Sequence, residues 1–437
     1  MSAPLPKIAF HTLGCKLNFA ETAAIARTVE AEGFAKTEFH EPADFYVINT
    51  CSVTESADKE MRQIVKRALK ANADAKVVII GCYAQLKPEE IASIPGVSMV
   101  LGAKEKFKLH EHIRQLEWQT ETIVEASDIE AVQFFSPAWS QGERTRTFLK
   151  VQDGCDYFCS FCTIPLARGA SRSANIAETV ANAQKAAATG VQEIVLTGVN
   201  IGDFGKMPDG SSRTEETFLQ LIQELEEKVD VPRFRISSIE PNLLTDDIIR
   251  FVAGSKKFMP HFHIPLQSGS NRILKFMRRK YLRELYESRV QTIKQLMPHC
   301  CIGVDVIVGF PGETDETFLE TYNFLNALDV SYFHVFTYSE RTNTKAANME
   351  ETVPLAVRKE RNKRLRILSE KKRYAFYSAF HNTVRAVLWE AENHDGRMNG
   401  FTDNYIKVET NFEANLSNTI TPFKLQTMET KSEVEAL

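Results

Sequence analysis

The chain has 437 residues, of which 43% are hydrophobic and 25% charged, so it has enough apolar material for buried cores and is not expected to be disordered. Its 53 Lys and Arg against 57 Asp and Glu give a net charge of −4, which excludes a strongly basic protein with a global attraction for nucleic acid. No apolar run approaches the ~18 residues of a membrane-spanning helix, and the N-terminus reads as a strand rather than a signal peptide, so we expect a cytoplasmic protein. In that reducing compartment the eight cysteines should serve metals or catalysis rather than disulfides.

Residues 1–136 are predicted to form a first domain, in which short apolar runs alternate with amphipathic stretches. Strands are expected at residues 7–13, 45–48 and 76–80, with helices at 18–33 and 55–72. This alternation predicts an open parallel α/β sheet covered by helices. Just beyond the three strands lie Cys15, Cys51 and Cys82. Because parallel strands end at one edge of a sheet, the three cysteines could converge on one crevice.

A linker is expected at residues 134–142, and a second domain is predicted over residues 137–378. Its strands are expected at residues 147–152, 193–200, 233–239, 261–267, 302–310 and 332–339. Helical patterns lie between them, at residues 175–189, 215–228, 243–253, 283–297 and 314–328. Six strand–helix units predict a partial, TIM-type (βα)6 barrel with its chemistry at the carboxyl ends of the strands.

The C-terminal part of the chain changes in character. A charged amphipathic helix is predicted over residues 356–376, and residues 379–437 then alternate β-branched and aromatic residues with polar ones. Turn signals occur at His394-Asp395-Gly396 and at Asn399-Gly400. These features predict a small all-β domain with a barrel fold.

The strongest chemical motif is a C-x3-C-x2-C loop in the sequence VQDGCDYFCSFCTIP, made by Cys155, Cys159 and Cys162. Three thiolates within eight residues could hold three corners of an iron–sulfur cube and leave one iron open. A zinc site is the alternative, but structural zinc normally takes a fourth Cys or His at short spacing, and none follows before His261.

This loop, with Phe161 before its last cysteine and placed after the first strand of a βα barrel, resembles the radical S-adenosylmethionine superfamily. The resemblance implies a [4Fe-4S] cluster whose open iron binds S-adenosylmethionine, and an electron transfer that cleaves the sulfonium to a 5′-deoxyadenosyl radical. It also implies cofactor-binding residues at the strand ends. We expect these to be Gly198, Ser237, Ser238, Glu240, Gln267, Ser268, Gly309 and Gly312. The alternative is that these Gly and Ser residues only form βα turns.

The three N-terminal cysteines ahead of such a barrel make the whole chain similar to the methylthiotransferase family, with a C-terminal TRAM-type barrel around GRMNGFTDNYIKVE. The resemblance implies that Cys15, Cys51 and Cys82 hold an auxiliary [4Fe-4S] cluster that carries the sulfur to be transferred. One S-adenosylmethionine would methylate this sulfur and a second would generate the radical that activates the substrate C–H bond. Cys300 and Cys301 have no spaced partner and are expected to be structural.

The residues around the first cysteine, TLGCKLNFAET, resemble the branch of the family that acts on N6-threonylcarbamoyladenosine beside the anticodon of tRNA. Lys16 and Asn18 favour this branch. Two other branches remain as alternatives, one acting on isopentenyladenosine in tRNA and one on an aspartate of a ribosomal protein.

Local basic patches supply a second indication of an RNA partner. Residues 358–373 contain nine Lys and Arg against two Glu, and a second patch lies at residues 272–283. We expect RNA contacts from Arg278, Arg279, Lys280, Arg364, Lys372, Arg385, Arg397 and Lys407. The alternative is solvated helix faces. Residues 381–437, however, have five Lys and Arg against nine Asp and Glu, which keeps the ribosomal-protein branch open.

The expected partners are the tRNA anticodon stem-loop, a flavodoxin- or ferredoxin-like electron donor and a sulfur donor, with the enzyme itself a monomer. A hypothesis of a different class is a non-catalytic iron–sulfur or zinc protein that binds RNA as a regulator. That regulator would bind metal without cleaving S-adenosylmethionine.

Overall fold

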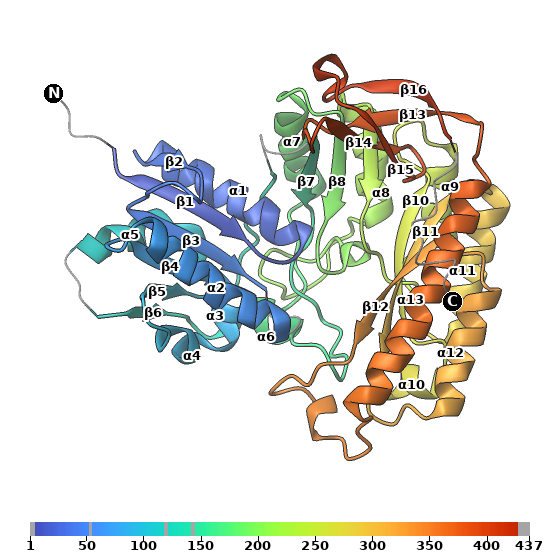
Figure 1. Ribbon diagram of the computed structural model, residues 1–437, viewed down its shortest axis with the longest axis horizontal. Coiled ribbons are helices and arrows are strands. Elements are labelled where there is room, and N and C mark those ends of the chain that lie inside the picture. Colours follow the sequence, from blue (N-terminus) through green and yellow to red (C-terminus); the bar gives the residue numbers. More distant parts are fainter. Residues whose placement is uncertain (1–4, 52–54, 118–120, 141–144, 427–437) are drawn as a thin grey trace.

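The computed structural model describes residues 5–51, 55–117, 121–140 and 145–426 (Figure 1). The N-terminal part is a six-stranded sheet. Its strands are β1 (Lys7–Thr12), β2 (Ala35–Thr37), β3 (Phe45–Thr50), β4 (Lys76–Gly81), β5 (Val97–Leu101) and β6 (Ile123–Glu125). They lie in the order β2-β1-β3-β4-β5-β6, and every pair is parallel. This confirms the predicted open α/β sheet.

Helices cover both faces of this sheet because its strands are buried on both sides. The longest are α1 (Lys16–Ala31) and α2 (Glu55–Ala71), and the shorter ones are α3 (Cys82–Leu86), α4 (Pro88–Ala92) and α5 (Leu109–Ile113). On one face α1 and α5 pack against β1, β3 and β4. On the other face α2 and α4 pack against the same strands. The near-continuous apolar strand Phe45–Thr50 is the pattern expected of a strand between two helix layers.

Six parallel strands form the second α/β unit. They are β7 (Arg146–Lys150), β8 (Glu193–Thr197), β9 (Arg233–Ile236), β10 (His261–Gln267), β11 (Cys301–Val308) and β12 (Tyr332–Thr337). They make two three-stranded sheets, which isolated parallel bridges join between β9 and β10 at Phe234–Phe258 and Ser238–His263. Among the described residues β12 does not pair with β7. The predicted partial barrel is confirmed, and it is open on one side.

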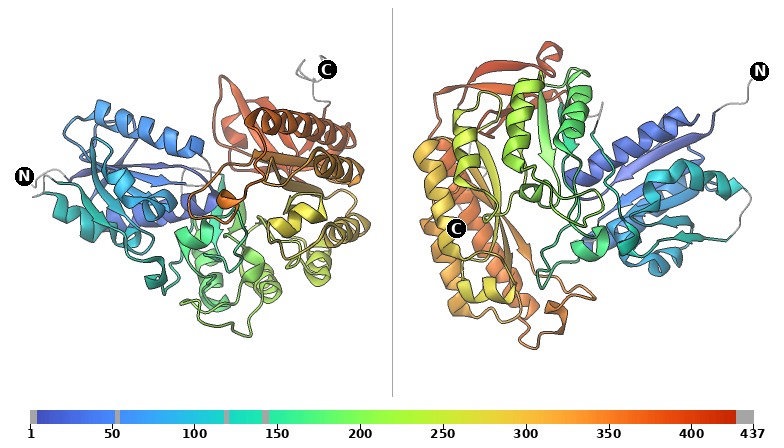
Figure 2. Two further views of the ribbon diagram at one scale, coloured as in Figure 1. Left: turned by 90° about the horizontal axis from the view of Figure 1, so that it is seen from below. Right: turned by 180° about the vertical axis from the view of Figure 1, so that it is seen from behind.

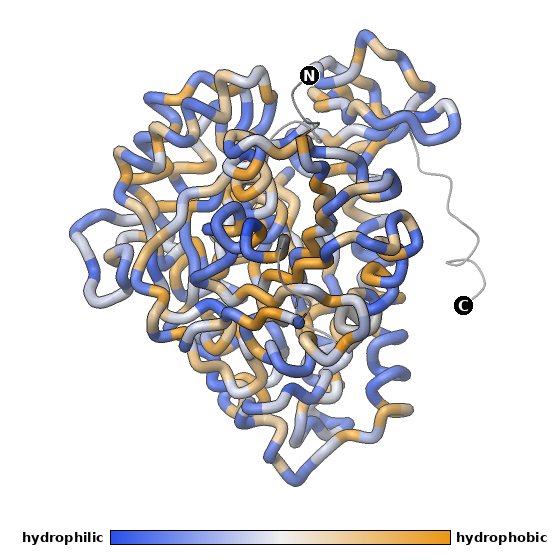
Figure 3. The backbone as a smooth tube through the Cα atoms, turned by 90° about the vertical axis from the view of Figure 1, so that its left-hand side faces the viewer, coloured by the Kyte–Doolittle hydropathy of each residue, from blue (hydrophilic) through white to orange (hydrophobic). Residues whose placement is uncertain are grey.

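Helices surround the outside of this barrel. They are α7 (Ile176–Ala187), α8 (Phe218–Lys228), α9 (Asp246–Gly254), α10 (Asn271–Phe276), α11 (Arg283–Leu296), α12 (Asp315–Ala327) and α13 (Leu355–Ser378). The short helix α6 (Ile164–Arg168) instead packs against α3 of the N-terminal part. Figure 3 shows mostly apolar tube at the centre of the molecule, whereas the outer helices alternate between apolar and polar residues. The core therefore lies between the barrel strands and their covering helices.

The expected linker at 134–142 contributes to the barrel rather than spanning free solvent, as far as the structure describes it. Ser140 N donates to Phe148 O (3.0 Å) and Lys150 N donates to Ala138 O (2.9 Å), so this segment pairs with β7. The two last residues of the expected linker lie outside the described residues. The predicted domain boundaries at 136 and 378 remain predictions.

The C-terminal part is a four-stranded antiparallel sheet. Its strands are β13 (Val384–Trp389), β14 (Arg397–Thr402), β15 (Lys407–Asn411) and β16 (Ile420–Lys424), in the order β15-β14-β13-β16. The small all-β domain is confirmed, and its predicted residues beyond 426 lie outside the described part. Figure 2 shows the sheet at one end of the barrel. There Arg233 Nη2 donates to Ala386 O (2.9 Å) and Tyr405 stacks on His261, at the amino-terminal ends of β9 and β10.

One turn in this domain was predicted wrongly. The His394-Asp395-Gly396 turn is present, with Asp395 and Gly396 both at positive φ. Asn399 and Gly400, however, lie inside β14. A β-carbon on Gly400 would come within 2.7 Å of the Trp389 ring, so this glycine allows close packing rather than a chain reversal.

No helix in the described part of the chain is both long enough and apolar enough to span a membrane.

Candidate active site

The C-x3-C-x2-C loop lies between β7 and α6, at the carboxyl end of the first barrel strand. Backbone N–H groups within the loop donate to sulfur, from Tyr157 to Cys155 Sγ (3.3 Å) and from Ile164 to Cys162 Sγ (3.4 Å). Burial, with the charges of the neighbouring thiolates, raises the pKa of Cys155 to about 12, and burial raises the pKa of Cys162 to about 12 as well. Binding iron to these sulfurs therefore requires release of their protons.

Arg279 is the residue outside the loop that most directly supports it. Its guanidinium donates to Cys159 Sγ (3.1 Å) and pairs with Glu240, and its side chain is only 4% exposed. The prediction that Arg279 contacts RNA is therefore wrong, because a buried guanidinium cannot reach a phosphate. Its charge instead stabilises a thiolate at Cys159 and compensates the carboxylate of Glu240.

A cavity of about 230 Å³ opens beside this loop and is lined by Phe161, Cys162, Gln267, Asp305 and Tyr338, among others. Gln267 has a positive φ of 66°, and it lies at the carboxyl end of β10 as predicted. The cavity thus joins the cysteine loop to the inside of the barrel. Its apolar walls and few polar groups are typical of a small-molecule site.

Three other expected cofactor-binding residues lie just beyond the ends of β8 and β9. Ser237 is buried at the end of β9, the Ser238 hydroxyl contacts His263, and a β-carbon on Gly198 would touch Gln152. Their cofactor contacts remain predictions, as do those of Glu240, Gln267 and Gly312.

Ser268 and Gly309, two further expected cofactor contacts, make hydrogen bonds within the protein. The Ser268 side chain is fully buried against Thr321 of α12 (3.1 Å). The Gly309 N–H already donates to Glu313 (2.8 Å), and Arg358 covers its α-carbon. Both residues take part in βα turns, and their cofactor contacts remain predictions.

The three N-terminal cysteines lie at neighbouring strand ends, as predicted. Cys15 precedes α1, Cys51 follows β3 and Cys82 begins α3, and strand register places Thr12 opposite Asn49 and Thr50 opposite Gly81. A β-carbon on Gly14 would lie 3.0 Å from Cys51 Sγ, so only glycine fits here, at φ +99°. Burial and then the charge of Cys82 raise the pKa of Cys15, whereas Arg168 acts in the opposite direction. No disulfide joins any of the eight cysteines.

Asn18 holds two of these cysteine loops together. Its Nδ2 donates to Leu13 O (2.9 Å) and to Thr50 O (3.1 Å), the carbonyls just before the Cys15 and Cys51 loops. Its Oδ1 accepts from Arg168 Nη2 (2.6 Å), which comes from α6 directly after the C-x3-C-x2-C loop. One buried contact thus connects the two cysteine groups. Sequence analysis used Asn18 only as a family signature and did not single out Arg168.

Arg168 belongs to a buried network of six charges between the N-terminal sheet and the barrel. Two carboxylates are surrounded by four cations, and each side chain is at most 4% exposed: Glu21, Asp153, Lys106, Lys150, Arg168 and Arg172. The cations exceed the carboxylates by two. Despite burial, the charge of Glu21 and then those of Cys82, Asp153 and Cys15 raise the pKa of Arg168, so this excess acts on Cys82 and Cys15. The network therefore favours negatively charged sulfur at the N-terminal site.

The network carried no local sequence signal because its members are far apart in the chain. Only the short spacing of Arg168 and Arg172 from Cys162 could have indicated it.

Among the basic residues expected to bind RNA, two besides Arg279 have structural roles. Lys372 donates to the carbonyls of Asn326 and Leu328 at the end of α12, and Arg385 forms a two-pronged ion pair with Asp403. The RNA contacts of both residues remain predictions. Arg397 is exposed but pairs with Glu409. The remaining members are exposed and stay predictions: Arg278, Lys280, Arg364 and Lys407.

Cys300 and Cys301 are buried at the start of β11, and Cys300 packs within the barrel core. Neither lies in a cysteine loop. Their predicted structural role agrees with this placement.

Comparison with known proteins agrees with this architecture. Residues 7–102 match the uncharacterized protein family UPF0004, and residues 149–325 match the radical SAM superfamily. The solved radical S-adenosylmethionine methyltransferase TsrM from Kitasatospora setae, with cobalamin and a [4Fe-4S] cluster bound, has the same fold over 78% of this chain and 77% of its own, at a TM-score of 0.59 and 17% identity. The barrel and its cysteine loop therefore define a radical SAM enzyme.

Curated relatives specify the class further. The chain is 42% identical to threonylcarbamoyladenosine tRNA methylthiotransferase MtaB of Bacillus subtilis, over 92% of this chain and 89% of the relative. It is 38% identical to the MtaB of Aquifex aeolicus, and 32% identical to the tRNA-2-methylthio-N(6)-dimethylallyladenosine synthase of Wolinella succinogenes over 96% of each chain. The chain belongs to the radical SAM methylthiotransferase family.

This membership makes the protein an enzyme that uses S-adenosylmethionine and [4Fe-4S] chemistry, which overturns the zinc and regulator hypotheses. The cysteine sites fit such a group. Sulfur is the ligand that iron–sulfur clusters require, and N–H donors to Cys155, Cys159 and Cys162 are the contacts that tune a bound cluster.

Proposed function

We propose that the protein methylthiolates N6-threonylcarbamoyladenosine beside the anticodon of tRNA, giving the 2-methylthio derivative, and that it uses two [4Fe-4S] clusters and two S-adenosylmethionine molecules. Cys155, Cys159 and Cys162 hold one cluster, and Cys15, Cys51 and Cys82 hold the other. When bound, the clusters and S-adenosylmethionine supply the radical chemistry and the sulfur. The observation that carries this proposal is the pair of cysteine groups joined through Arg168 and Asn18.

The chain's own residues position these groups. Asn18 fixes the spacing of the Cys15 and Cys51 loops, and Arg168 with its network favours negative charge there. Arg279 and two backbone N–H groups do the same for the barrel loop. The cavity lined by Cys162 and Gln267 takes S-adenosylmethionine and keeps water from its reacting end.

The threonylcarbamoyl substrate is supported by the names of the relatives at 38–42% identity, against 31–32% for the dimethylallyl synthases. The isopentenyladenosine branch is the second candidate because those relatives also cover most of the chain. The ribosomal-protein branch is the remaining alternative.

The tRNA is expected to present its anticodon stem-loop to exposed basic residues such as Lys280 and Arg364. A flavodoxin- or ferredoxin-like protein supplies electrons, a separate donor restores the sulfur, and the enzyme acts as a cytoplasmic monomer.

Nucleoside analysis of tRNA tests the substrate. Cells that lack the gene should lose 2-methylthio-N6-threonylcarbamoyladenosine and accumulate its unmethylthiolated precursor, and the wild-type gene should restore it. Loss of the 2-methylthio-isopentenyladenosine signal instead would move the enzyme to the second branch. Unchanged levels of both nucleosides, in a strain with no second enzyme, would refute the proposal.

A further inference from the structure

The outer side of the C-x3-C-x2-C loop is attached to an exposed part of the surface. Ser160 follows Cys159 in the loop. Its N–H donates to Met277 O (3.1 Å), and its hydroxyl donates to Phe276 O (2.8 Å). Its carbonyl accepts from the N–H of Ala346 (2.8 Å). These three hydrogen bonds fix the cysteine loop between the end of α10 and the segment around residue 346.

Exposed aromatic and basic side chains lie around this junction. Phe158, directly before Cys159, is 65% exposed, and Phe276 is 37% exposed. Four exposed cations of α10, the turn after it and the segment around residue 346 form no ion pair with a described residue: Arg272, Lys275, Arg278 and Lys345. One carboxylate, that of Glu351, lies near Phe276 at Gly312. The two phenylalanines and the four cations are called the loop-side patch below.

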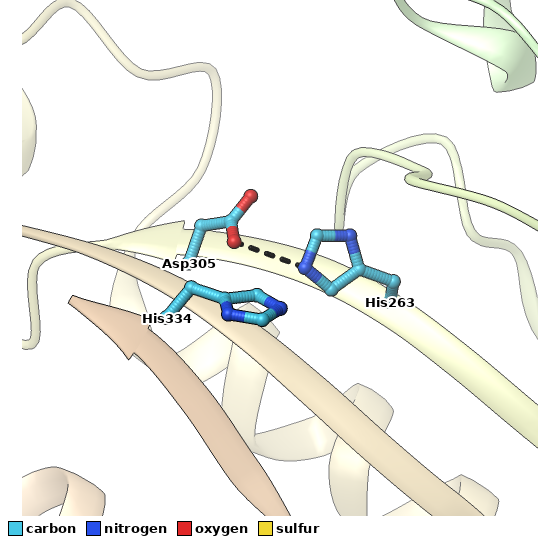
Figure 4. Close-up of side chains that lie close together, drawn as sticks. All are labelled: His263, Asp305 and His334. Carbon is cyan, nitrogen blue, oxygen red and sulfur yellow. Dashed lines mark hydrogen bonds and ion pairs between the residues drawn. The ribbon is translucent and has the colours of Figure 1, made fainter. Parts of the chain in front are cut away.

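The inner side of the loop belongs to the cavity. Cys162 lines that cavity together with Asp305. Asp305 lies close to His263 and His334 of the neighbouring strands, and their polar atoms are all within 4.8 Å of one another (Figure 4). A cavity of about 230 Å³ with such polar groups suits a small molecule and cannot admit a protein. A protein that acts on the loop must therefore approach it from outside.

The loop-side patch lies on this outer side. Cys159 accepts a hydrogen bond from Arg279, whose side chain is 4% exposed, whereas the next residue back, Arg278, is exposed at a positive φ of 58°. A buried apolar cluster that includes Met277 and Tyr338 extends from the junction to the cavity wall. The patch is thus one residue away from a contact to Cys159, and packed protein separates it from the cavity.

We propose that the loop-side patch docks the protein that delivers electrons to the C-x3-C-x2-C site, a small one-electron carrier with an acidic face. This inference rests on the function proposed above and assigns a surface to its electron donor. The carrier loses one electron, and the [4Fe-4S] group held by the loop gains it. Exposed aromatic rings beside unpaired cations match the apolar core and polar rim of protein interfaces. Opposite charges speed the encounter, and transient electron-transfer complexes need only a small contact area.

An RNA backbone is the other anion that these cations could bind. The position of the patch favours the carrier. It lies on the Cys159 side of the loop, whereas a base that is to be modified must reach the barrel interior, on the Cys162 side. The test below therefore measures the binding of both partners.

Flavodoxin binding to the reconstituted holoenzyme tests the patch, with an acidic flavodoxin as the probe. Lys275→Glu and Lys345→Glu each reverse one charge, on the two segments that hold the loop. Lys185→Glu is the matched control, an exposed lysine on α7, which lies near the top of the view in Figure 1 while α10 lies near the bottom. We expect each patch variant to weaken flavodoxin binding about 5- to 10-fold at low salt, and the control to keep the wild-type affinity. The difference should shrink as the ionic strength rises from about 0.05 M to about 0.5 M, because salt screens exposed charges.

Chemical reduction separates docking from damage to the loop. With dithionite as the reductant and no RNA present, Lys275→Glu should contain wild-type iron and cleave S-adenosylmethionine at the wild-type rate. With limiting flavodoxin as the reductant, its cleavage rate should fall by about the factor by which its affinity falls. A lower rate with both reductants would make Lys275 a structural residue of the loop and overturn its docking role.

The remaining outcomes distinguish this inference from the function on which it rests. Wild-type flavodoxin affinity in both patch variants, or no flavodoxin binding to the wild-type enzyme, would refute the docking site while the proposed function stands. Weaker binding of an anticodon stem-loop by both variants, with unchanged flavodoxin binding, would assign the patch to RNA. If the dithionite-reduced wild-type enzyme does not modify an RNA that carries N6-threonylcarbamoyladenosine, the proposed function itself fails.

Discussion

Arg168 Nη2 donates a 2.6 Å hydrogen bond to Asn18 Oδ1, and this contact joins the segment that follows one group of cysteines to the helix that follows the other. The same guanidinium contacts both oxygens of Glu21 at 3.1 Å. Because the Asn18 amide also holds the carbonyls before the Cys15 and Cys51 loops, the position of α6 determines the geometry of the N-terminal site. The two sites are therefore built as one unit.

Replacing Arg168 should destabilise this unit. Arg168→Gln removes a buried cation that contacts Glu21 and Asp153, and breaking one side of a buried ion pair costs about 3–5 kcal/mol. Urea denaturation of the variant should show a loss of that size. The control is Arg250→Gln, an exposed Arg–Asp pair that is expected to contribute less than about 1 kcal/mol. Equal losses in the two variants would contradict this account.

The same network predicts a dependence of stability on pH. The cations Arg168, Lys106 and Lys150 hold the pKa of Glu21 well below its ordinary value despite burial. A carboxyl group with a depressed folded pKa stabilises the fold above its unfolded pKa of about 4.3, and this contribution disappears as the pH falls below that value.

Glu21→Gln should therefore be less stable than the wild type at pH 7, and the difference should shrink between about pH 5 and pH 3. Denaturation of the metal-free protein across this range measures it. Glu320→Gln, an exposed carboxylate on α12, should show no comparable trend. A constant difference for Glu21→Gln would argue against the ionised form of this residue in the fold.

Arg279 should matter to the barrel loop through its charge. Arg279→Met removes the donor to Cys159 and leaves Glu240 uncompensated beside the three thiols. We expect reconstituted Arg279→Met to lose most of the iron of that loop, about four per chain, together with reductive cleavage of S-adenosylmethionine. Arg279→Lys should retain part of both, because a lysine keeps the charge without the planar geometry. Wild-type iron and cleavage in Arg279→Met would exclude the role.

We expect the cysteines to separate into cluster ligands and structural residues. The wild-type chain should bind about eight irons, and Cys82→Ala should lose about half of them. Cys300→Ala should keep all of them and lose only about 1–2 kcal/mol of stability, since it leaves a small gap in the barrel core. Iron analysis after anaerobic reconstitution distinguishes the two variants. Iron loss in Cys300→Ala would reverse the assignment.

Close packing at Gly400 gives a further test in the C-terminal sheet. Gly400→Val would push a branched side chain against Val387 and Trp389. Overpacking of this kind costs about 1–3 kcal/mol, so the thermal midpoint should fall. Tryptophan fluorescence checks this, because the valine should change the environment of Trp389. If Gly400 were a turn residue, the substitution would disturb only the turn and the fluorescence would stay unchanged.

The sequence by itself determined the secondary structure and the identity of the cysteine ligands proposed here. Hydrophobic periodicity is local, so alternating strands and helices predicted the parallel sheet and the open barrel, and the position of each cysteine just after a strand placed it at a reactive edge. The short spacing of Cys155, Cys159 and Cys162 can also be read from the sequence alone, and it keeps the three thiols close together in any fold.

Only the tertiary structure decided which charged residues serve the sites. Arg279 looked like a surface cation and is buried against Cys159, and Arg168 joins Asn18 from 150 residues away. Ser268 and Gly309, expected at the cofactor, also hydrogen-bond to Thr321 and Glu313 in the structure. Sequence patterns report which residue types are near one another along the chain. The role of a charge, however, depends on its burial and on partners brought together by packing, and these are set only when the sheet, the barrel and the helices between them are assembled.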